Sequence, residues 1–386
     1  MTNNTSNDIK FVDTPDQLEQ FAAEIASQPW IALDTEFLRE RTYRPELCLL
    51  QIATPETVAC IDPLALDNID PLLDVIYDSS IIKVLHAASQ DLEIFYWLRG
   101  SVPTNLFDTQ IAAPLLGYQE QIGYANLVNE LLGVTLSKSH SRADWTRRPL
   151  PEQQAQYAAD DVIYLAEMYP VMHSRLEKLK RLPWLDPEWH NLTNPHLYEK
   201  PVDDVWKRLR SIDRLKGQRL AVAQHLAKWR ELTARKRNMP RNWLVKDEVL
   251  LDIAKQLPDS IEELKHIRGL SDGAVKTHGE EILNHIQQAK NVDPVKLDPA
   301  KRKVKLTADQ DATLDLLNAV AKIHAREFEI NASILAPRKS IEDLIHGNTN
   351  TAVMQGWRGQ LIGPALVSVL DGKTGLKVDN GTVVIG

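Results

Sequence analysis

Two carboxylates stand close together at the end of an apolar stretch. Residues 30–37 read Trp-Ile-Ala-Leu-Asp-Thr-Glu-Phe, with Asp34 and Glu36 as the charged positions. Because successive side chains of a strand point to opposite faces, this pattern places both carboxylates on the same face. Such a pair is costly near a protein interior unless a cation neutralises it, and carboxylate oxygens suit Mg²⁺ or Mn²⁺. The segment therefore predicts a metal site, although two solvated acids at a strand end would show the same pattern.

Two further carboxylates and a phenol follow later in the chain. Asp91 lies where a predicted strand gives way to a predicted helix. Tyr157 and Asp161 are four residues apart in a predicted helix, so they share one face with Cβ atoms about 5–6 Å apart, and Asp160 points elsewhere. A phenol beside a metal-bound carboxylate can orient an attacking water. Taken singly, an acid in a first helical turn and a core tyrosine would explain these residues without a metal.

The elements around these residues predict a mixed α/β domain. Residues 14–17, Thr-Pro-Asp-Gln, carry the signals of a helix N-terminus. Apolar runs at 47–53 and 57–62 predict a hairpin beside the first strand. A further strand is expected at 81–86 with a helix after it, and a long amphipathic helix at 151–179. We therefore expect a mixed sheet of five to six strands flanked by helices.

Length and composition bound the classes of protein that the chain can represent. At 386 residues it is too long for one ordinary core, so two or three domains are expected. The net charge of −8 hides a basic region at 201–290, which holds 18 Lys and Arg against 13 Asp and Glu and leaves 27 against 40 for the rest. Cys48 and Cys60 form no metal-binding or disulfide pattern. Residues 1–8 lack a secretory pattern and no segment approaches a membrane span, so we expect a cytoplasmic protein.

Two basic segments and one histidine are candidates for substrate contact. The connector at 137–150 could contact phosphates through its arginines and stack Trp145 on a base, or it could be a solvated loop anchored by that ring. The basic run at 235–237 ends a predicted helix, where it could bind phosphate or simply oppose the helix dipole. His86 could touch substrate, and a core histidine is the alternative. The candidate contacts are His86, Trp145, Arg147, Arg148, Arg235, Lys236 and Arg237, with Arg142 in the same connector.

The second half of the chain contains an internal repeat. Ser260-Ile-Glu-Glu-Leu-Lys-His266 and Ser340-Ile-Glu-Asp-Leu-Ile-His346 agree at five of seven positions. Each copy is predicted to be a small helical module. The second copy has no counterpart of the basic run and reads Arg-Glu-Phe-Glu-Ile-Asn at 326–331. The sequence therefore leaves its contact with nucleic acid open.

The order and spacing of Asp-x-Glu, a middle Asp and Tyr-x-x-x-Asp resemble the tyrosine-bearing branch of the DEDD exonuclease superfamily. The sequence segments around these residues are similar to those of bacterial ribonuclease D. They are Leu33-Asp-Thr-Glu-Phe37, His86-Ala-Ala-Ser-Gln-Asp-Leu-Glu93, Phe107-Asp-Thr-Gln110, Asp144-Trp-Thr-Arg-Arg-Pro-Leu150 and Tyr157-Ala-Ala-Asp-Asp-Val162. The resemblance implies a ribonuclease-H-like sheet and two bound divalent cations, Mg²⁺ or Mn²⁺. The implied catalytic residues are Asp34, Glu36, Asp91, Tyr157 and Asp161, of which the four acids would be the metal ligands.

The resemblance also implies a domain order and a reaction. We expect an exonuclease domain at 1–200, followed by two all-α HRDC (helicase-and-ribonuclease-D C-terminal) domains at 201–293 and 294–386, the second divergent. The expected activity is 3′→5′ hydrolysis of RNA with a free 3′ end to nucleoside 5′-monophosphates, especially of transfer RNA precursors, by a monomer. A DNA 3′ exonuclease is an alternative because recognition of the 2′-hydroxyl is not visible in sequence. A catalytically silent RNA-binding scaffold is another.

Overall fold

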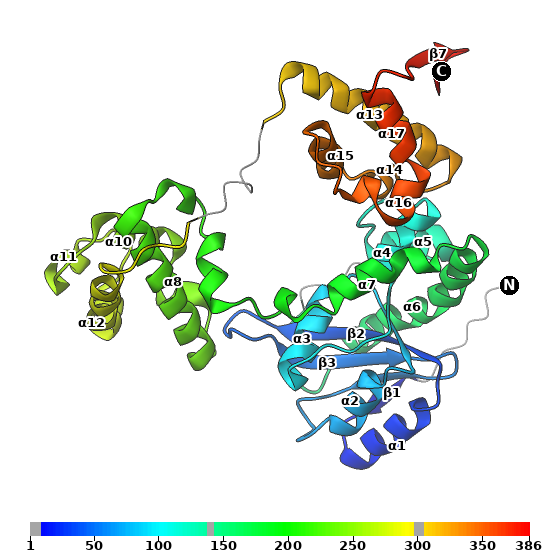
Figure 1. Ribbon diagram of the computed structural model, residues 1–386. Helices are drawn as coiled ribbons and strands as arrows, with labels where there is room; N and C mark the ends of the chain where they lie inside the picture. Colours follow the sequence, from blue (N-terminus) through cyan, green and yellow to red (C-terminus); the bar gives the residue numbers. More distant parts are fainter. Residues whose placement is uncertain (1–8, 137–142, 297–304) are drawn as a thin grey trace.

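The predicted sheet forms around the strand that carries Asp34 and Glu36. In the computed structural model (Figure 1), which describes residues 9–136, 143–296 and 305–386, the sheet has the strand order β1-β4-β3-β2-β5-β6. The strands are β1 Lys10–Val12, β2 Trp30–Leu38, β3 Glu46–Ala53, β4 Val58–Ile61, β5 Ile82–Leu85 and β6 Leu106–Asp108. As predicted, β2, β3 and β4 pair antiparallel; β1, β5 and β6 join in parallel. The three-residue strands β1 and β6 were not predicted, because so short a segment shows no periodicity.

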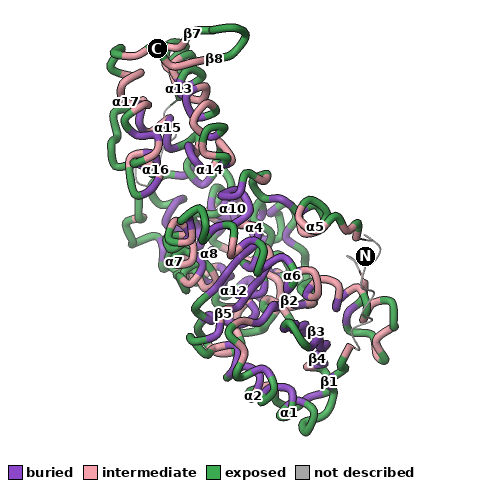
Figure 2. Tube along the Cα trace, turned by 90° about the vertical axis from the view of Figure 1, so that its right-hand side faces the viewer, coloured by how far each residue is buried: buried purple, intermediate pink, exposed green. Residues whose placement is uncertain are grey.

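Helices cover both faces of this sheet. The helices are α1 Pro15–Ile25, α2 Asp70–Tyr77 and α3 Ser89–Arg99 on one face, and α4 Thr109–Ala112, α5 Tyr124–Leu132 and α6 Glu152–Lys178 on the other. Alternation along β2 divides its side chains accordingly: Ile31 and Leu33 join the core with α1 to α3, and Ala32 joins the core with α6. Figure 2 shows the inner strands β3 and β4 buried along nearly their whole length. None of the described helices is long and apolar enough to cross a membrane.

The first helical module has its own core. A connection of η2 Leu182–Leu185, α7 Asp186–Leu192 and η3 Pro195–Leu197 leads to it. The module consists of η4 Val202–Arg208, η5 Ile212–Arg214, α8 Gly217–Arg237, α9 Arg241–Leu244, α10 Asp247–Gln256, α11 Ile261–Lys265 and α12 Asp272–Ala289. Its apolar cluster runs from Val205 to Ala289 and lies wholly within the predicted 201–293. The domain limits themselves stay predictions.

The second helical module differs from the expected all-α fold at its end. Its elements are α13 Ala308–Glu327, α14 Ala332–Leu335, α15 Arg338–Ile345, η7 Ala352–Met354, α16 Gly356–Leu361, α17 Gly363–Leu370, β7 Leu376–Asp379 and β8 Thr382–Ile385. The two strands form an antiparallel hairpin. Asn380 and Gly381 both have positive φ, which is the turn chemistry that a two-residue hairpin requires. The module is therefore helical as expected, with this short hairpin added at its end.

Each copy of the sequence repeat lies at a short helix, α11 or α15, but the two serines are used differently. Ser260 lies at the N-cap of α11, where its Oγ accepts a hydrogen bond from the Glu263 N–H at 3.3 Å. Ser340 is buried inside α15, and its Oγ accepts from the Val353 N–H at 3.0 Å. The repeat thus marks a short helix in each module without fixing the residue at which that helix begins.

The second module packs against the sheet domain in one continuous apolar core. The rings of Trp184 and Trp357 stack with centroids 4.7 Å apart and planes 8° apart. The Arg181 guanidinium donates to the carbonyl oxygens of Leu115 at 2.7 Å and Phe328 at 2.5 Å. These contacts fix the second module to the end of α6 and its connection.

The first module meets a different end of the sheet domain through polar contacts. The Tyr43 hydroxyl donates to Glu231 of α8, and Arg235 donates to Glu199 at 2.6 Å. Figure 1 shows the two modules apart from each other, on different sides of the sheet domain. One module is therefore attached by apolar packing and the other by ionic contacts.

Replacement of Trp357 by alanine tests the apolar attachment. Because Trp357 is only 8% exposed, Trp357→Ala should lower stability by about 3 kcal/mol or more and the unfolding midpoint by roughly 6–12 °C. Trp243→Ala is the control, since that ring is 59% exposed and should change stability by less than about 0.5 kcal/mol. Differential scanning calorimetry measures both variants. Equal midpoints would contradict the packing role of Trp357.

Candidate active site

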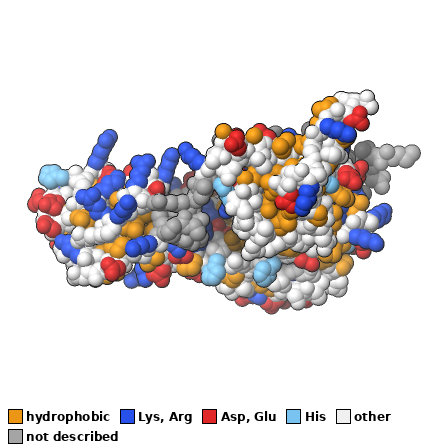
Figure 3. Space-filling model, turned by 45° about the horizontal axis from the view of Figure 1, so that its top comes forward, with side chains coloured by type: hydrophobic (Ala, Val, Ile, Leu, Met, Phe, Trp, Pro, Cys, Tyr) orange, Lys and Arg blue, Asp and Glu red, His pale blue; other side chains and the backbone are white. Residues whose placement is uncertain are grey.

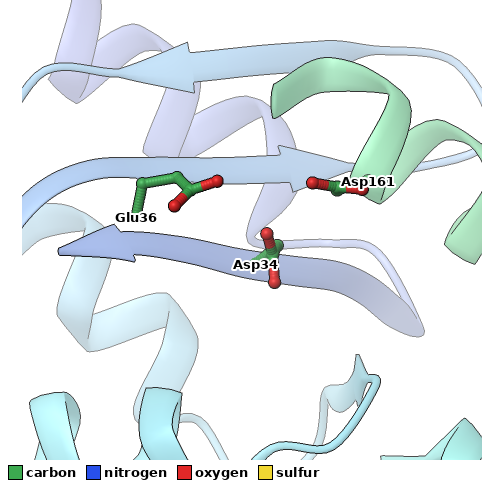
Figure 4. Close-up of side chains that lie close together, drawn as sticks. All are labelled: Asp34, Glu36 and Asp161. Atoms are coloured by element: carbon green, nitrogen blue, oxygen red, sulfur yellow. The ribbon is translucent and has the colours of Figure 1, made fainter. Parts of the chain in front are cut away.

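Three carboxylates from two elements converge on one point. Asp34, Glu36 and Asp161 each bring an oxygen within 4.8 Å of the others (Figure 4). The first two come from β2, on the face covered by α6, and the third comes from α6 itself. The alternating side-chain directions of β2 and the packing of α6 across that strand bring the three carboxylates together. A set of carboxylate oxygens so close together fits a hard divalent cation such as Mg²⁺ or Mn²⁺.

Asp91 approaches the same place from the opposite side of β2. The pairing of β2 with β5 ends at Ala32, so the later part of β2 has β3 as its single described neighbour strand. This leaves room for the first turn of α3, where Asp91 accepts a hydrogen bond from the Thr35 hydroxyl at 2.5 Å. Asp91 is not among the three residues whose oxygens lie within 4.8 Å of one another, so its role as a metal ligand stays a prediction.

Thr35 was not predicted as a site residue. It stands between the two acids of the Asp-Thr-Glu word, and alternation points its hydroxyl toward α3. That alternation was the signal that could have identified it. By holding one oxygen of Asp91, Thr35 fixes the direction of that carboxylate.

Burial and mutual repulsion raise the pKa values of these acids. Burial, followed by the charges of Asp161 and Asp91, raises the pKa of Glu36 to about 8. The pKa values of Asp91 and Asp161 rise to about 7, also mainly through burial. The pKa of Asp34 lies well above its ordinary value because of burial and the three neighbouring acids. A bound cation would reverse this repulsion and favour the ionised forms.

Tyr157 and Trp145 lie together beside this cluster. Burial, then the charges of Asp161, Glu36 and Asp34, raises the pKa of Tyr157 above its ordinary value, so the phenol is neutral and keeps its proton. The Trp145 ring is 5% exposed, and its centroid lies 6.3 Å from that of Tyr157. The structure thus places Trp145 in the core, as the anchored-loop interpretation expects, and leaves its ring no open face for a base.

Arg148 also has a structural position. Its guanidinium forms an ion pair with the buried Asp62, with N–O distances of 2.5 and 2.7 Å, and donates to the carbonyl oxygen of Cys48 at 2.7 Å. The arginine therefore ties the connector to β3 and β4. Arg147 is exposed and remains a candidate substrate contact, whereas Arg142 lies outside the described residues.

The remaining predicted substrate contacts divide in the same way. Both ring nitrogens of His86 have partners, Thr109 Oγ1 at 2.9 Å and the Ile122 carbonyl oxygen at 3.1 Å, so it is a core histidine. Burial lowers its pKa and favours the neutral ring. Arg235 is bound within the module joint, while Lys236 and Arg237 are exposed. No contact joins these three residues to the acidic cluster within the described part of the chain.

Gln51 is a second polar residue that sequence reasoning missed. It is fully buried in β3, directly opposite Asp34 in the antiparallel register. Within the described residues, neither its amide nitrogen nor its amide oxygen has a hydrogen-bond partner. A glutamine inside an otherwise apolar strand at 47–53 was the signal that could have identified it.

Comparison with known proteins identifies the family. Residues 9–177 match the sequence profile of a 3′–5′ exonuclease family, and residues 219–286 match the HRDC domain. Ribonuclease D of Sphingobium indicum is 42% identical over 373 residues, which cover 94% of this chain and 95% of that protein. The chain belongs to the ribonuclease D family. The ribonuclease D of Zymomonas mobilis is 38% identical and covers 95% of both chains.

A solved ribonuclease D structure shows the same architecture. The crystal structure of Escherichia coli RNase D, described as an exoribonuclease involved in structured RNA processing, matches with a TM-score of 0.80 at 33% identity. The match covers 94% of this chain and 99% of that chain. The expected fold and the expected class, a 3′→5′ exoribonuclease of the DEDD type, are therefore confirmed. The DNA exonuclease and silent-scaffold alternatives are disfavoured by this assignment.

The raised pKa values predict how metal and pH act together on stability. Each acid has a folded-state pKa above its unfolded value near 4, so the stability present at low pH is lost as pH rises through about 7 to 8. In EDTA the unfolding midpoint should fall between pH 5 and pH 9. Mn²⁺ at about 100 times its Kd should raise the midpoint by roughly 5–10 °C at pH 8, and by less at pH 5.5. Differential scanning fluorimetry measures both trends, and a metal-induced rise that is independent of pH would contradict them.

Proposed function

We propose that this chain removes nucleotides from the 3′ end of RNA at the acidic cluster, with two divalent cations held by Asp34, Glu36, Asp91 and Asp161. The observation that carries the proposal is the convergence of three carboxylates within 4.8 Å, with Asp91 beside them. When bound, such cations stabilise the attacking and the leaving oxygen of a phosphodiester displacement. The products would be nucleoside 5′-monophosphates.

The protein residues supply position and proton control in this proposal. Tyr157 is neutral and shares a helical face with Asp161, so its hydroxyl can hold the attacking water by a hydrogen bond. Thr35 holds Asp91. The four acids must be ionised to bind cations, and the cations in turn favour ionisation. Tyr157 therefore orients the nucleophile without having to lose its own proton.

The substrate is proposed to be RNA with a free 3′ end, in particular transfer RNA precursors and other small structured RNAs. The solved E. coli relative is described as acting in structured RNA processing. Lys and Arg side chains gather over the first helical module (Figure 3), and residues 201–290 hold 18 of them against 13 acids. Such a surface favours a polyanion. We propose that the chain acts as a monomer in the cytoplasm, since transfer RNA precursors are found there.

A pair of adjacent aspartates gives a sharp test of the site. Asp161→Asn should lower kcat by at least about 10³-fold, because it removes a proposed ligand of the cations. Asp160→Asn is the matched control, since Asp160 points away and accepts a hydrogen bond from Gln156 at 2.8 Å. Release of nucleoside monophosphates from a 5′-labelled RNA with a single-stranded 3′ tail measures both variants, beside the matching DNA.

Several outcomes of this assay would count against the proposal. Retained activity in Asp161→Asn would remove Asp161 from the metal site. Equal loss of activity in Asp160→Asn would show that the effect comes from negative charge near the helix in general. Shortening of the DNA but not of the RNA would show that the substrate is DNA.

Tyr157→Phe should keep RNA binding and lower kcat by about 10²-fold, because the phenol is proposed to position the attacking water.

A further inference from the structure

A cationic pocket lies in the joint between the sheet domain and the first helical module. Its volume is about 570 Å³, and five cationic side chains against two acidic ones line it. They are Arg39, Lys200, Arg208, Arg235 and Arg241, with Glu93 and Glu231. We call it the joint pocket. Its charge excess suits an anion.

Three of the cations in the joint pocket already have partners. Arg39 holds both oxygens of Glu93 at 2.6 and 2.7 Å. Arg235 and Arg241 share the buried Glu231, at 3.2 and 3.3 Å. These ion pairs hold the walls of the pocket together, so the two acids are fully used by the protein itself.

The other two cations, Lys200 and Arg208, have no ion pair among the described residues. Partial burial of its guanidinium, together with the charge of Arg241, lowers the pKa of Arg208 below its ordinary range. Arg208 is exposed at the pocket near Arg241 and Arg235, and the one acid whose charge also reaches it, Glu231, is already shared by those two arginines. A phosphate oxygen would relieve that repulsion and accept hydrogen bonds from both side chains.

Two residues that line the joint pocket follow acids of the cluster closely in the chain. Arg39 follows Glu36 by three residues at the end of β2, and Glu93 follows Asp91 by two residues in α3. Tyr198 also lines the pocket, and its pKa is raised by burial and then by the charges of Glu93, Asp108 and Asp91. An RNA strand whose 3′ end reaches the cluster therefore has a cationic pocket next to it.

We propose that the joint pocket binds a backbone phosphate of the RNA, on the 5′ side of the terminal nucleotide, through Lys200 and Arg208. This subsite rests on the proposed function, because the RNA is the strand whose end is cut at the acidic cluster. The pocket exists only where the first module meets the sheet domain. It thus gives that module a defined contact with the substrate through Arg208.

The test compares Lys200→Ala/Arg208→Ala with Arg210→Ala, which removes an exposed arginine two residues from Arg208 and outside the pocket. Fluorescence anisotropy with a 5′-labelled ten-nucleotide RNA in EDTA gives the Kd at several KCl concentrations. The double variant should bind about 10-fold more weakly, and its slope of log affinity against log salt should fall by about 0.7, the share of one single-strand phosphate. Arg208→Lys should retain the slope.

The outcomes separate this subsite from the nuclease itself. If the double variant matches Arg210→Ala in Kd and slope, the subsite is wrong, whatever the enzyme cleaves. If the double variant shows the expected loss of affinity and slope relative to wild type, but wild type cuts no RNA with Mg²⁺ or Mn²⁺ present, the subsite stands and the proposed function fails. A second arm measures inhibition of RNA hydrolysis by AMP. If the double variant loses inhibition by AMP while its RNA affinity is unchanged, the pocket binds the released nucleotide. That result would overturn the proposal that the pocket binds an RNA phosphate.

Gln51 carries a second, independent inference about the acidic cluster. Residues directly opposite in an antiparallel pair lie on the same face with Cβ atoms about 4.5–5.5 Å apart, so Gln51 stands next to Asp34 beneath α6. A fully buried amide without hydrogen-bond partners lowers the free energy of unfolding by about 1–3 kcal/mol. Stability therefore does not account for a glutamine at this position of the core strand. We infer that Gln51 is a positioning residue whose amide N–H holds the Asp34 carboxylate in place as a metal ligand.

Calorimetric titration of the intact protein with Mn²⁺ tests this role without relying on activity. Gln51→Leu should bind Mn²⁺ 10- to 100-fold more weakly, as loss of a hydrogen bond to a ligand does. In EDTA it should unfold at the same or a higher temperature, because an unpaired buried amide is gone. Gln154→Leu is the control, since Gln154 in the first turn of α6 also has a buried oxygen without a partner among the described residues. An unchanged Mn²⁺ affinity in Gln51→Leu, or an equal loss in both variants, would overturn the inference.

Discussion

Repulsion between buried carboxylates is the constraint on which the architecture of the sheet domain depends. Asp34, Glu36 and Asp161 bring oxygens within 4.8 Å of one another, and Asp91 adds a fourth nearby charge. In water these acids would move apart, so the fold must hold them where burial and mutual repulsion destabilise their ionised forms. β2 fixes two of them by its pleat, and α6 fixes the third because it is buried along the sheet face. The repulsion is therefore concentrated at the point where a bound cation can neutralise it.

The groups around the cluster are arranged to keep that geometry rigid. Thr35 holds Asp91, and Trp145 packs against Tyr157. Arg148 ties the Trp145 connector to the sheet through the buried Asp62. Trp145 and Arg148, two of the predicted substrate contacts, are thus held in structural contacts behind the site. A basic or aromatic residue near an active site is as useful for support as for recognition.

The two helical modules are attached to the sheet domain by different physics. The second module shares an apolar core with it, centred on the stacked rings of Trp184 and Trp357, which makes that joint insensitive to salt. The first module keeps its own core and meets the sheet domain through Tyr43, Glu231 and Arg235. The joint with the first module holds Lys200 and Arg208 without acidic partners among the described residues, whereas Arg181 at the apolar joint donates to two carbonyl oxygens. The joint pocket, with its excess of cations, accordingly lies where the first module meets the sheet domain.

The sequence by itself determined the chemistry and most local structure. The pattern of Asp34 and Glu36 predicted a strand with two acids on one face, and the spacing of Tyr157 and Asp161 predicted a shared helical face, because both periodicities are local properties of the backbone. Only the tertiary structure decided that α6 lies across β2, that Thr35 reaches Asp91, and that Gln51 stands buried beside Asp34. It also decided which arginines face solvent. Those outcomes depend on strand order and on contacts between residues far apart in the chain, and neither periodicity nor composition encodes the partner of a side chain.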